Sequence, residues 1–208
     1  MGQVTQTIEE LRVVLDQQDK GNQATVVGWD DSKFPFTGNN IDVASGRIDY
    51  SYPNGTISFQ NNARYPNEAV SMLDQLSHKW KEGSEIRPHF HWLQQSANVP
   101  NWLMAYKIYD NNASATVDTD YTNHTFVTST PVFTYTSGTL AQISVFPPID
   151  MTGYTLSDMV HYVFWRDTSN ASGEFAGADP SSSAEHVLEF DIHYQTDQER
   201  GSRQEFIK

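Results

Sequence analysis

Short runs of alternating apolar and polar residues dominate the chain after Gly28 and predict a protein built from β-strands. Pro, Gly, Asn, Asp and Ser separate these runs, as is typical of antiparallel strands joined by turns. The clearest pair covers 47–52 and 56–60, joined by a Pro-Asn-Gly turn, and predicts a hairpin. The other expected strands cover 70–76, 86–93, 102–109, 124–128, 131–135, 141–146, 159–166 and 186–194. This pattern favours an all-β fold, an antiparallel two-sheet β-sandwich of the jelly-roll type.

The first segment alone has a helical pattern. Its apolar residues recur at spacings of three, four and seven, and they are Ile8, Leu11, Val14 and Leu15. We therefore expect a short N-terminal helical arm over 1–25, followed by a single β-sandwich domain over 26–208. The apolar stripe of this helix must be covered, either by the body of the protein or by another subunit.

Strand parity predicts which side chains face away from the core, because successive side chains of a strand point to opposite faces. In 86–92 the even positions are apolar, and the odd positions hold Arg87, His89 and His91. In 186–194 the same rule predicts outward-facing side chains for Glu189, Asp191 and His193. The same rule predicts inward-facing side chains for Leu188, Phe190, Ile192 and Tyr194. If the two polar faces are neighbours, cross-strand pairs of opposite charge stabilise them.

Composition narrows the range of partners. The 208 residues carry a formal net charge of −13, which disfavours direct binding to nucleic acid or to anionic membranes. The sequence contains no cysteine, so disulfides, thiolate metal sites and thiol nucleophiles are excluded. The N-terminal residues lack the basic start and apolar core of a signal peptide, so we expect a protein that is not exported by the general secretory route.

A His-x-His pair is the strongest candidate for metal chemistry. Gly83, His89, His91 and Gln95 resemble the first metal motif of the cupin family. Two histidines at alternate strand positions project from one face and can hold one divalent ion. Gln95 stands where the family has a glutamate, and the second cupin motif is missing, so we expect no bound metal and no cofactor. In the cupin-like alternative the further ligands would come from His186 or His193 and from Glu189 or Asp191.

Other chemical signals are weaker. Asp118 and Asp120 offer oxygen ligands for calcium, but their loop lacks the glycine and terminal glutamate of an EF-hand. Nucleophile-elbow, Walker, dinucleotide-binding and zinc-protease motifs are missing, so we expect no catalysis. Aromatic side chains on an exposed strand face would stack on sugar rings and bind a glycan. The candidates for that role are Tyr109, Tyr121 and Trp165.

Three segments resemble small structural proteins of tailed bacteriophages: VGWDDSKFPF at 27–36, FQNNARYP at 59–66 and HKWKEGSEIRPHFHW at 78–92. The resemblance implies an all-β body, self-association and a place on the particle exterior. We therefore expect a non-enzymatic virion structural protein, an external capsid decoration or cement protein that forms a homotrimer. Its partners would be the major capsid protein or another virion protein.

Two alternatives remain beside the capsid decoration protein. One is a tail or head spike, or glycan-binding jelly-roll module, and the other is the cupin-like metal-binding protein. In the preferred interpretation, the contacts with sister subunits or with the capsid would use Ile8, Leu11, Val14, Leu15, Arg87, His89 and His91.

Overall fold

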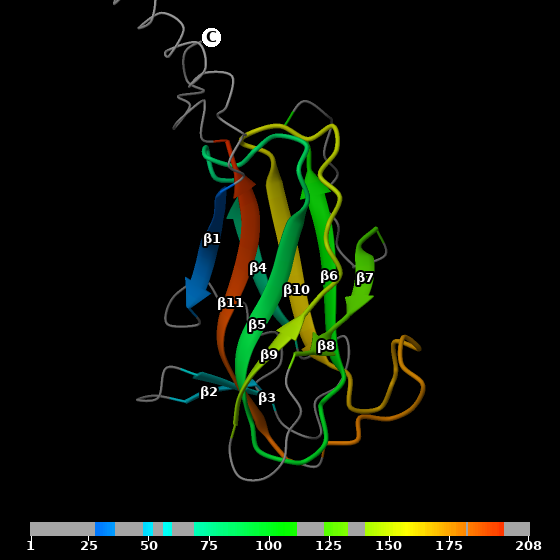
Figure 1. Cartoon of the computed structure of the whole chain (residues 1–208). Coiled ribbons are helices and arrows are strands. Elements are labelled where there is room, and N and C mark those ends of the chain that lie inside the picture. Colours follow the sequence, from blue (N-terminus) through cyan, green and yellow to red (C-terminus); the bar gives the residue numbers. More distant parts are fainter. Residues whose placement is uncertain are drawn as a thin grey trace, which may run out of the picture.

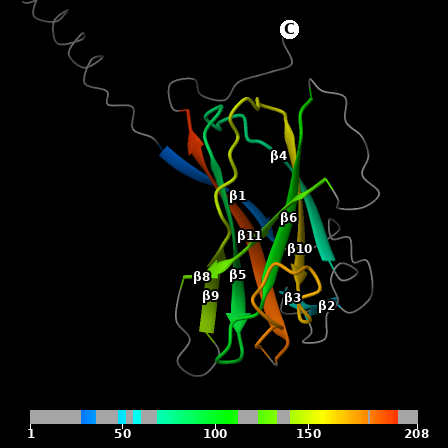
Figure 2. The ribbon, with the colours of Figure 1, turned by 90° about the vertical axis from the view of Figure 1, so that its right-hand side faces the viewer.

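The structure is a computed structural model that describes residues 28–35, 48–51, 56–59, 69–111, 123–132, 140–181 and 183–197. Within these ranges the chain forms eleven β-strands, arranged in two antiparallel sheets. The two sheets form the layers of a sandwich, as the views in Figures 1 and 2 show. The all-β, two-sheet prediction is therefore confirmed. The expected N-terminal helix and the arm over 1–25 lie outside the described residues.

The larger sheet has seven strands in the order β2-β3-β11-β5-β9-β8, and β1 also pairs with β11. Its strands are β1 (Gly28–Pro35), β2 (Ile48–Ser51), β3 (Thr56–Phe59), β5 (Ile86–Gln94), β8 (Thr130–Pro131), β9 (Leu140–Val145) and β11 (Glu185–Thr196). The smaller sheet has the order β4-β10-β6-β7. Its strands are β4 (Ala69–Gln75), β6 (Trp102–Tyr109), β7 (Thr125–Thr128) and β10 (Met159–Arg166).

The order of the main strands is that of a jelly roll. Numbered along the chain, the eight strands β3, β4, β5, β6, β7, β9, β10 and β11 form one sheet in the order 1-8-3-6 and the other in the order 2-7-4-5. The first and last of these strands, β3 and β11, are therefore neighbours. The predicted hairpin is also present, because β2 pairs with β3 over Ile48–Ser51 and Thr56–Phe59.

Aromatic side chains from both sheets fill the space between the layers. Phe90 of β5 lies edge-to-face on Trp102 of β6, with ring centroids 5.2 Å apart. Phe164 of β10 contacts Phe190 of β11 at 4.5 Å between ring centroids. Such tilted and edge-to-face pairs add stabilisation beyond the burial of their area. Trp92 completes this group and is fully buried, so the predicted inward face of β5 is confirmed.

Parity fails at one place in β11. The register with β5 shifts between Val187 and Glu189, so the alternation of faces changes there. Val187 is buried in the core, whereas Leu188 is only partly buried. The inward prediction for Leu188 is therefore wrong, because an extra residue in a strand displaces every side chain before it to the opposite face.

The outer side of the smaller sheet is partly covered, which the strand pattern did not predict. Trp165 and Leu103 are completely buried there, with Phe126 of β7 and Phe175 packed against them. The rings of Phe126 and Trp165 stack at 6.0 Å between centroids. Trp165 is therefore a core residue of a second cluster, which rules it out as a candidate for stacking on a sugar.

The connection between β10 and β11 is tied to the sandwich by Arg166. This guanidinium is fully buried and forms an ion pair with Asp179, Nε to Oδ2 2.9 Å. It also donates to the backbone carbonyls of Phe59, Ser181 and Ser183 at 2.9, 2.9 and 2.6 Å. This set of contacts, named here the Arg166 clamp, fixes a loop rich in Ser, Gly and Ala against both sheets.

Candidate functional site

The two predicted polar faces lie side by side on the outer face of the larger sheet. Antiparallel pairing of β5 with β11 places His89 opposite Asp191. Strand β1 pairs with the other side of β11, so that Asp31 lies opposite His193 and Lys33 lies opposite Asp191. Three strands thus bring imidazoles, carboxylates and an ammonium group together on one surface, named here the histidine face.

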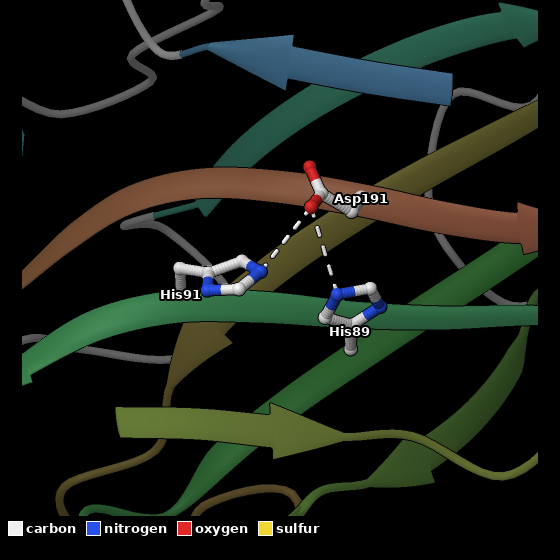
Figure 3. A group of neighbouring side chains, drawn as sticks. All are labelled: His89, His91 and Asp191. Atoms are coloured by element: carbon white, nitrogen blue, oxygen red, sulfur yellow. Dashed lines mark ion pairs between the residues drawn. The ribbon is translucent and has the colours of Figure 1, made fainter. Parts of the chain in front are cut away.

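At the centre of the histidine face, two imidazoles of β5 point toward one carboxylate of β11, as Figure 3 shows. His91 Nε2 lies 3.2 Å from Asp191 Oδ2, and His89 Nε2 lies 3.6 Å from the same oxygen. One potential ligand atom from each residue lies within 4.8 Å of the others. The His-x-His spacing produces this arrangement because residues two apart share a face of the strand.

Two members of this group are removed from water. Asp191 has 2% of its surface exposed and His89 has 5%. Burial raises the pKa of the Asp191 carboxyl, an effect that Lys33 and His91 partly offset. Burial, together with the neighbouring His193 and His91, lowers the pKa of His89 to about 4. At neutral pH the His89 imidazole is therefore neutral, so its approach to Asp191 is not a true ion pair.

Asp191 is not fully satisfied by its neighbours. Its Oδ2 lies near His89, His91 and the exposed ammonium group of Lys33, whose Nζ is 3.8 Å away. Its Oδ1 is buried and has no hydrogen-bond partner among the described residues. Buried polar atoms in native proteins nearly always have a partner, so this oxygen is an exception that calls for a physical explanation.

An exposed tryptophan borders the histidine face. Trp29 of β1 is 45% exposed, and the guanidinium carbon of Arg87 lies 4.9 Å from the centroid of its ring. Next to it, His193 Nε2 lies 3.1 Å from Asp31 Oδ1. Trp29 was not among the aromatic residues expected at the surface. The signal was its parity with Asp31 and Lys33, which places all three on the outer side of β1.

The seven predicted interface residues divide into two groups. Three are brought together on β5, where Arg87 is exposed, His91 is half-buried and His89 is almost buried. The other four, Ile8, Leu11, Val14 and Leu15, lie outside the described residues. The assignment of the set to contacts with sister subunits or with the capsid stays a prediction.

The remaining candidates lie elsewhere. His186 is near β3, with its Nδ1 3.2 Å from Thr56 Oγ1, and it does not join the group around Asp191. Tyr109 is half-buried at the end of β6, with Lys107 Nζ 5.1 Å from its ring centroid. Tyr121, Asp118 and Asp120 lie outside the described residues. Across the described ranges there is no helix with the length and apolar character needed to span a membrane.

Comparison with known proteins finds likeness of fold at low similarity. No family model and no curated protein matches the sequence. A CBM35 module from Cellvibrio japonicus Abf62 aligns with a TM-score of 0.35 and 10% identity, over 80% of this chain and 98% of that one. The enzymatically active domain of tailspike protein 4 from bacteriophage CBA120 aligns with a TM-score of 0.33 and 9% identity.

The tailspike alignment covers 80% of this chain but only 19% of the tailspike chain. A third structure, TmCBM61 in complex with β-1,4-galactotriose, aligns with a TM-score of 0.28 and 9% identity, over 79% of this chain and 86% of that one. The β-sandwich of this chain resembles two carbohydrate-binding modules and a phage tailspike domain at low TM-score.

Proposed function

We propose that the protein is a non-enzymatic glycan-binding module that binds sugar through the outer face of β1, β11 and β5. The observation that carries the proposal is Trp29, which leaves 45% of its surface exposed at the edge of the histidine face. A large aromatic ring in water is costly because it keeps apolar surface unburied. Ligand sites commonly combine an aromatic side chain with a few polar groups that orient the ligand.

The residues around Trp29 match the chemistry of a sugar. A pyranose ring has an apolar face of C–H groups and a rim of hydroxyls that both donate and accept hydrogen bonds. The indole ring offers an apolar surface for the first, and Asp31, Arg87 and His193 offer acceptors and donors for the second. A few polar groups around an aromatic platform are the usual means of orienting such a ligand.

The resemblance to tailed-phage structural proteins supports a place on the exterior of a virion. A net charge of −13 is compatible with this place, because a negative protein is repelled by the packaged genome and stays soluble. In that setting the module would recognise polysaccharides of the bacterial surface, as part of a tail or head spike.

The test is binding of the purified full chain to a panel of bacterial surface polysaccharides. We expect Trp29→Ala to weaken binding at least tenfold, which corresponds to about 1.4 kcal/mol. Leu73→Ala is the matched control, because Leu73 is 53% exposed on the smaller sheet and its loss should leave binding unchanged. Failure of the wild-type protein to bind any member of the panel, or equal binding by Trp29→Ala, would contradict the proposal.

A second candidate function is capsid decoration by a homotrimer, which the amphipathic N-terminal pattern favours. Light scattering should then give three times 23.6 kDa. Removal of residues 1–20 should abolish attachment to capsid shells and leave the β-sandwich folded. A protein that stays monomeric at micromolar concentration and ignores shells would rule this candidate out.

A further inference from the structure

We propose that His89, His91 and Asp191 form a binding site for one divalent transition-metal ion of the Zn²⁺ class. The site lies on the outer face of the larger sheet, between β5 and β11 (Figure 3). This inference goes beyond glycan binding and does not depend on it, since the three residues are defined without reference to Trp29.

The distances fit a tetrahedral ion. With metal–ligand bonds of about 2.0–2.1 Å, two ligand atoms of a tetrahedral zinc site lie about 3.3 Å apart. The separations from Asp191 Oδ2 are 3.2 Å to His91 Nε2 and 3.6 Å to His89 Nε2. Two of the three ligand–ligand separations are therefore close to the required value, and one ligand atom from each of the three residues lies within 4.8 Å of the others.

The burial of the Asp191 carboxylate also favours a bound cation. The Asp191 carboxylate is 2% exposed, and its Oδ1 has no hydrogen-bond partner in the described part of the chain. Because water does not reach it, the loss of hydration is not made up by hydrogen bonds from the protein. The nearest ammonium group, that of Lys33, is largely exposed and lies 3.8 Å from the other oxygen. A cation bound to Oδ2, between the carboxylate and the imidazoles, would balance the buried negative charge that Lys33 offsets only in part.

The donor set selects the class of ion. Imidazole nitrogen suits Zn²⁺, Cu²⁺, Ni²⁺ and Fe²⁺, whereas Ca²⁺ and Mg²⁺ take oxygen ligands. Three protein ligands leave a coordination position open. His91 is half-exposed, so that position would face solvent. The ring of His193 lies 4.4 Å from that of His89 and packs beside this ligand.

The experiment uses the full chain without a histidine tag, stripped with a chelator and titrated with Co²⁺. A four- or five-coordinate Co²⁺ site is recognised by its visible absorption, and Zn²⁺ should abolish that absorption by competition. We expect one ion per chain, and an affinity at least tenfold weaker in His91→Ala and in Asp191→Asn. His186→Ala is the matched control, because His186 contacts Thr56 instead, and it should bind the ion as the wild type does.

Both test variants keep the aromatic core intact, since His91 is half-exposed and Asn replaces Asp with little change of shape. Thermal melts with and without Zn²⁺ provide a second readout, in which Zn²⁺ should raise the melting temperature of the wild type more than that of either variant. Trp29→Ala should bind the ion normally, which separates this site from the glycan proposal. Three results would overturn the inference: no binding at micromolar Co²⁺ or Zn²⁺, binding that both variants retain, or displacement of Zn²⁺ by equimolar Ca²⁺.

Discussion

Arg166 and Asp191 are both charged and both buried, but they differ in how fully the surrounding residues satisfy them with hydrogen bonds. Arg166 has 0% of its side chain exposed and donates hydrogen bonds to one carboxylate and three backbone carbonyls. Asp191 has 2% exposed, yet one of its oxygens has no hydrogen-bond partner among the described residues. The first charge is neutralised by its own chain and the second only in part.

The difference separates a structural charge from a candidate binding site. The partners of Arg166 come from β3 and from the loop before β11, so the clamp joins segments far apart in the sequence. Its geometry serves the fold and leaves nothing for a ligand. The group around Asp191 lies on an outer face, keeps acceptor capacity and contains perturbed pKa values, all of which are features of functional sites.

The largest expected effect is on the clamp. Arg166→Met should lower the free energy of unfolding by about 3–5 kcal/mol, because it leaves the Asp179 carboxylate and several carbonyls buried without their donor. Urea denaturation measures this loss. Arg87→Met is the control, since Arg87 is exposed and pairs with Glu85 at the surface, where an ion pair contributes less than about 1 kcal/mol. Similar losses in the two variants would show that the clamp does not stabilise the fold as described.

Asp74 is a third buried ionisable group, and it shows what burial does to a carboxyl group that is not held by a clamp. Asp74 of β4 lies on the core side of the smaller sheet, and burial raises its pKa to about 7. The folded state therefore holds this proton more tightly than the unfolded state does. The contribution of Asp74 to stability is fully present below about pH 4, and it is lost as the pH rises through about 7.

Asp74→Asn should remove that loss, which amounts to roughly 2–3 kcal/mol between pH 5 and pH 8. Urea denaturation at pH 5 and pH 8 checks it: the wild type should lose stability between the two values, and the variant should lose much less. If both proteins lose the same amount over this range, another group is responsible for the pH dependence.

The fold was largely predictable because alternation identifies strands and their faces. The pattern in 86–92 placed Arg87, His89 and His91 outward, and the parity of Asp191 and His193 placed them on the matching side of β11. Strand β1 was missed. Its inner side carries the polar residues Asp30 and Ser32, and Phe34 is the one large apolar side chain there, so β1 lacks the alternation of apolar and polar residues that marks the other strands.

Other features of the fold could not be predicted from local sequence, because they depend on contacts between distant segments. The register shift after Val187 depends on how β11 meets β5, and the burial of Trp165 depends on Phe126 and Phe175 from distant segments. Arg166 is satisfied mainly by backbone carbonyls, which every residue has. The loop that it fixes resembles a flexible linker in composition, because small polar residues are common to both.

The smallest expected effect is also the most informative for the comparison. In chelator at neutral pH, Asp191→Asn should change the free energy of unfolding by no more than about 1 kcal/mol, with stabilisation the expected direction. Burial disfavours the charged form of Asp191 more than Lys33 and His91 favour it, which is why its pKa is raised.

The same substitution in the clamp, Asp179→Asn, is the matched control and should cost about 3–5 kcal/mol because it leaves Arg166 buried with its charge unpaired. Urea denaturation of both variants under one condition makes the comparison direct. A loss of about 3 kcal/mol or more from Asp191→Asn would mean that its own neighbours already satisfy this carboxylate. The reason for expecting a cation between His89, His91 and Asp191 would then be gone.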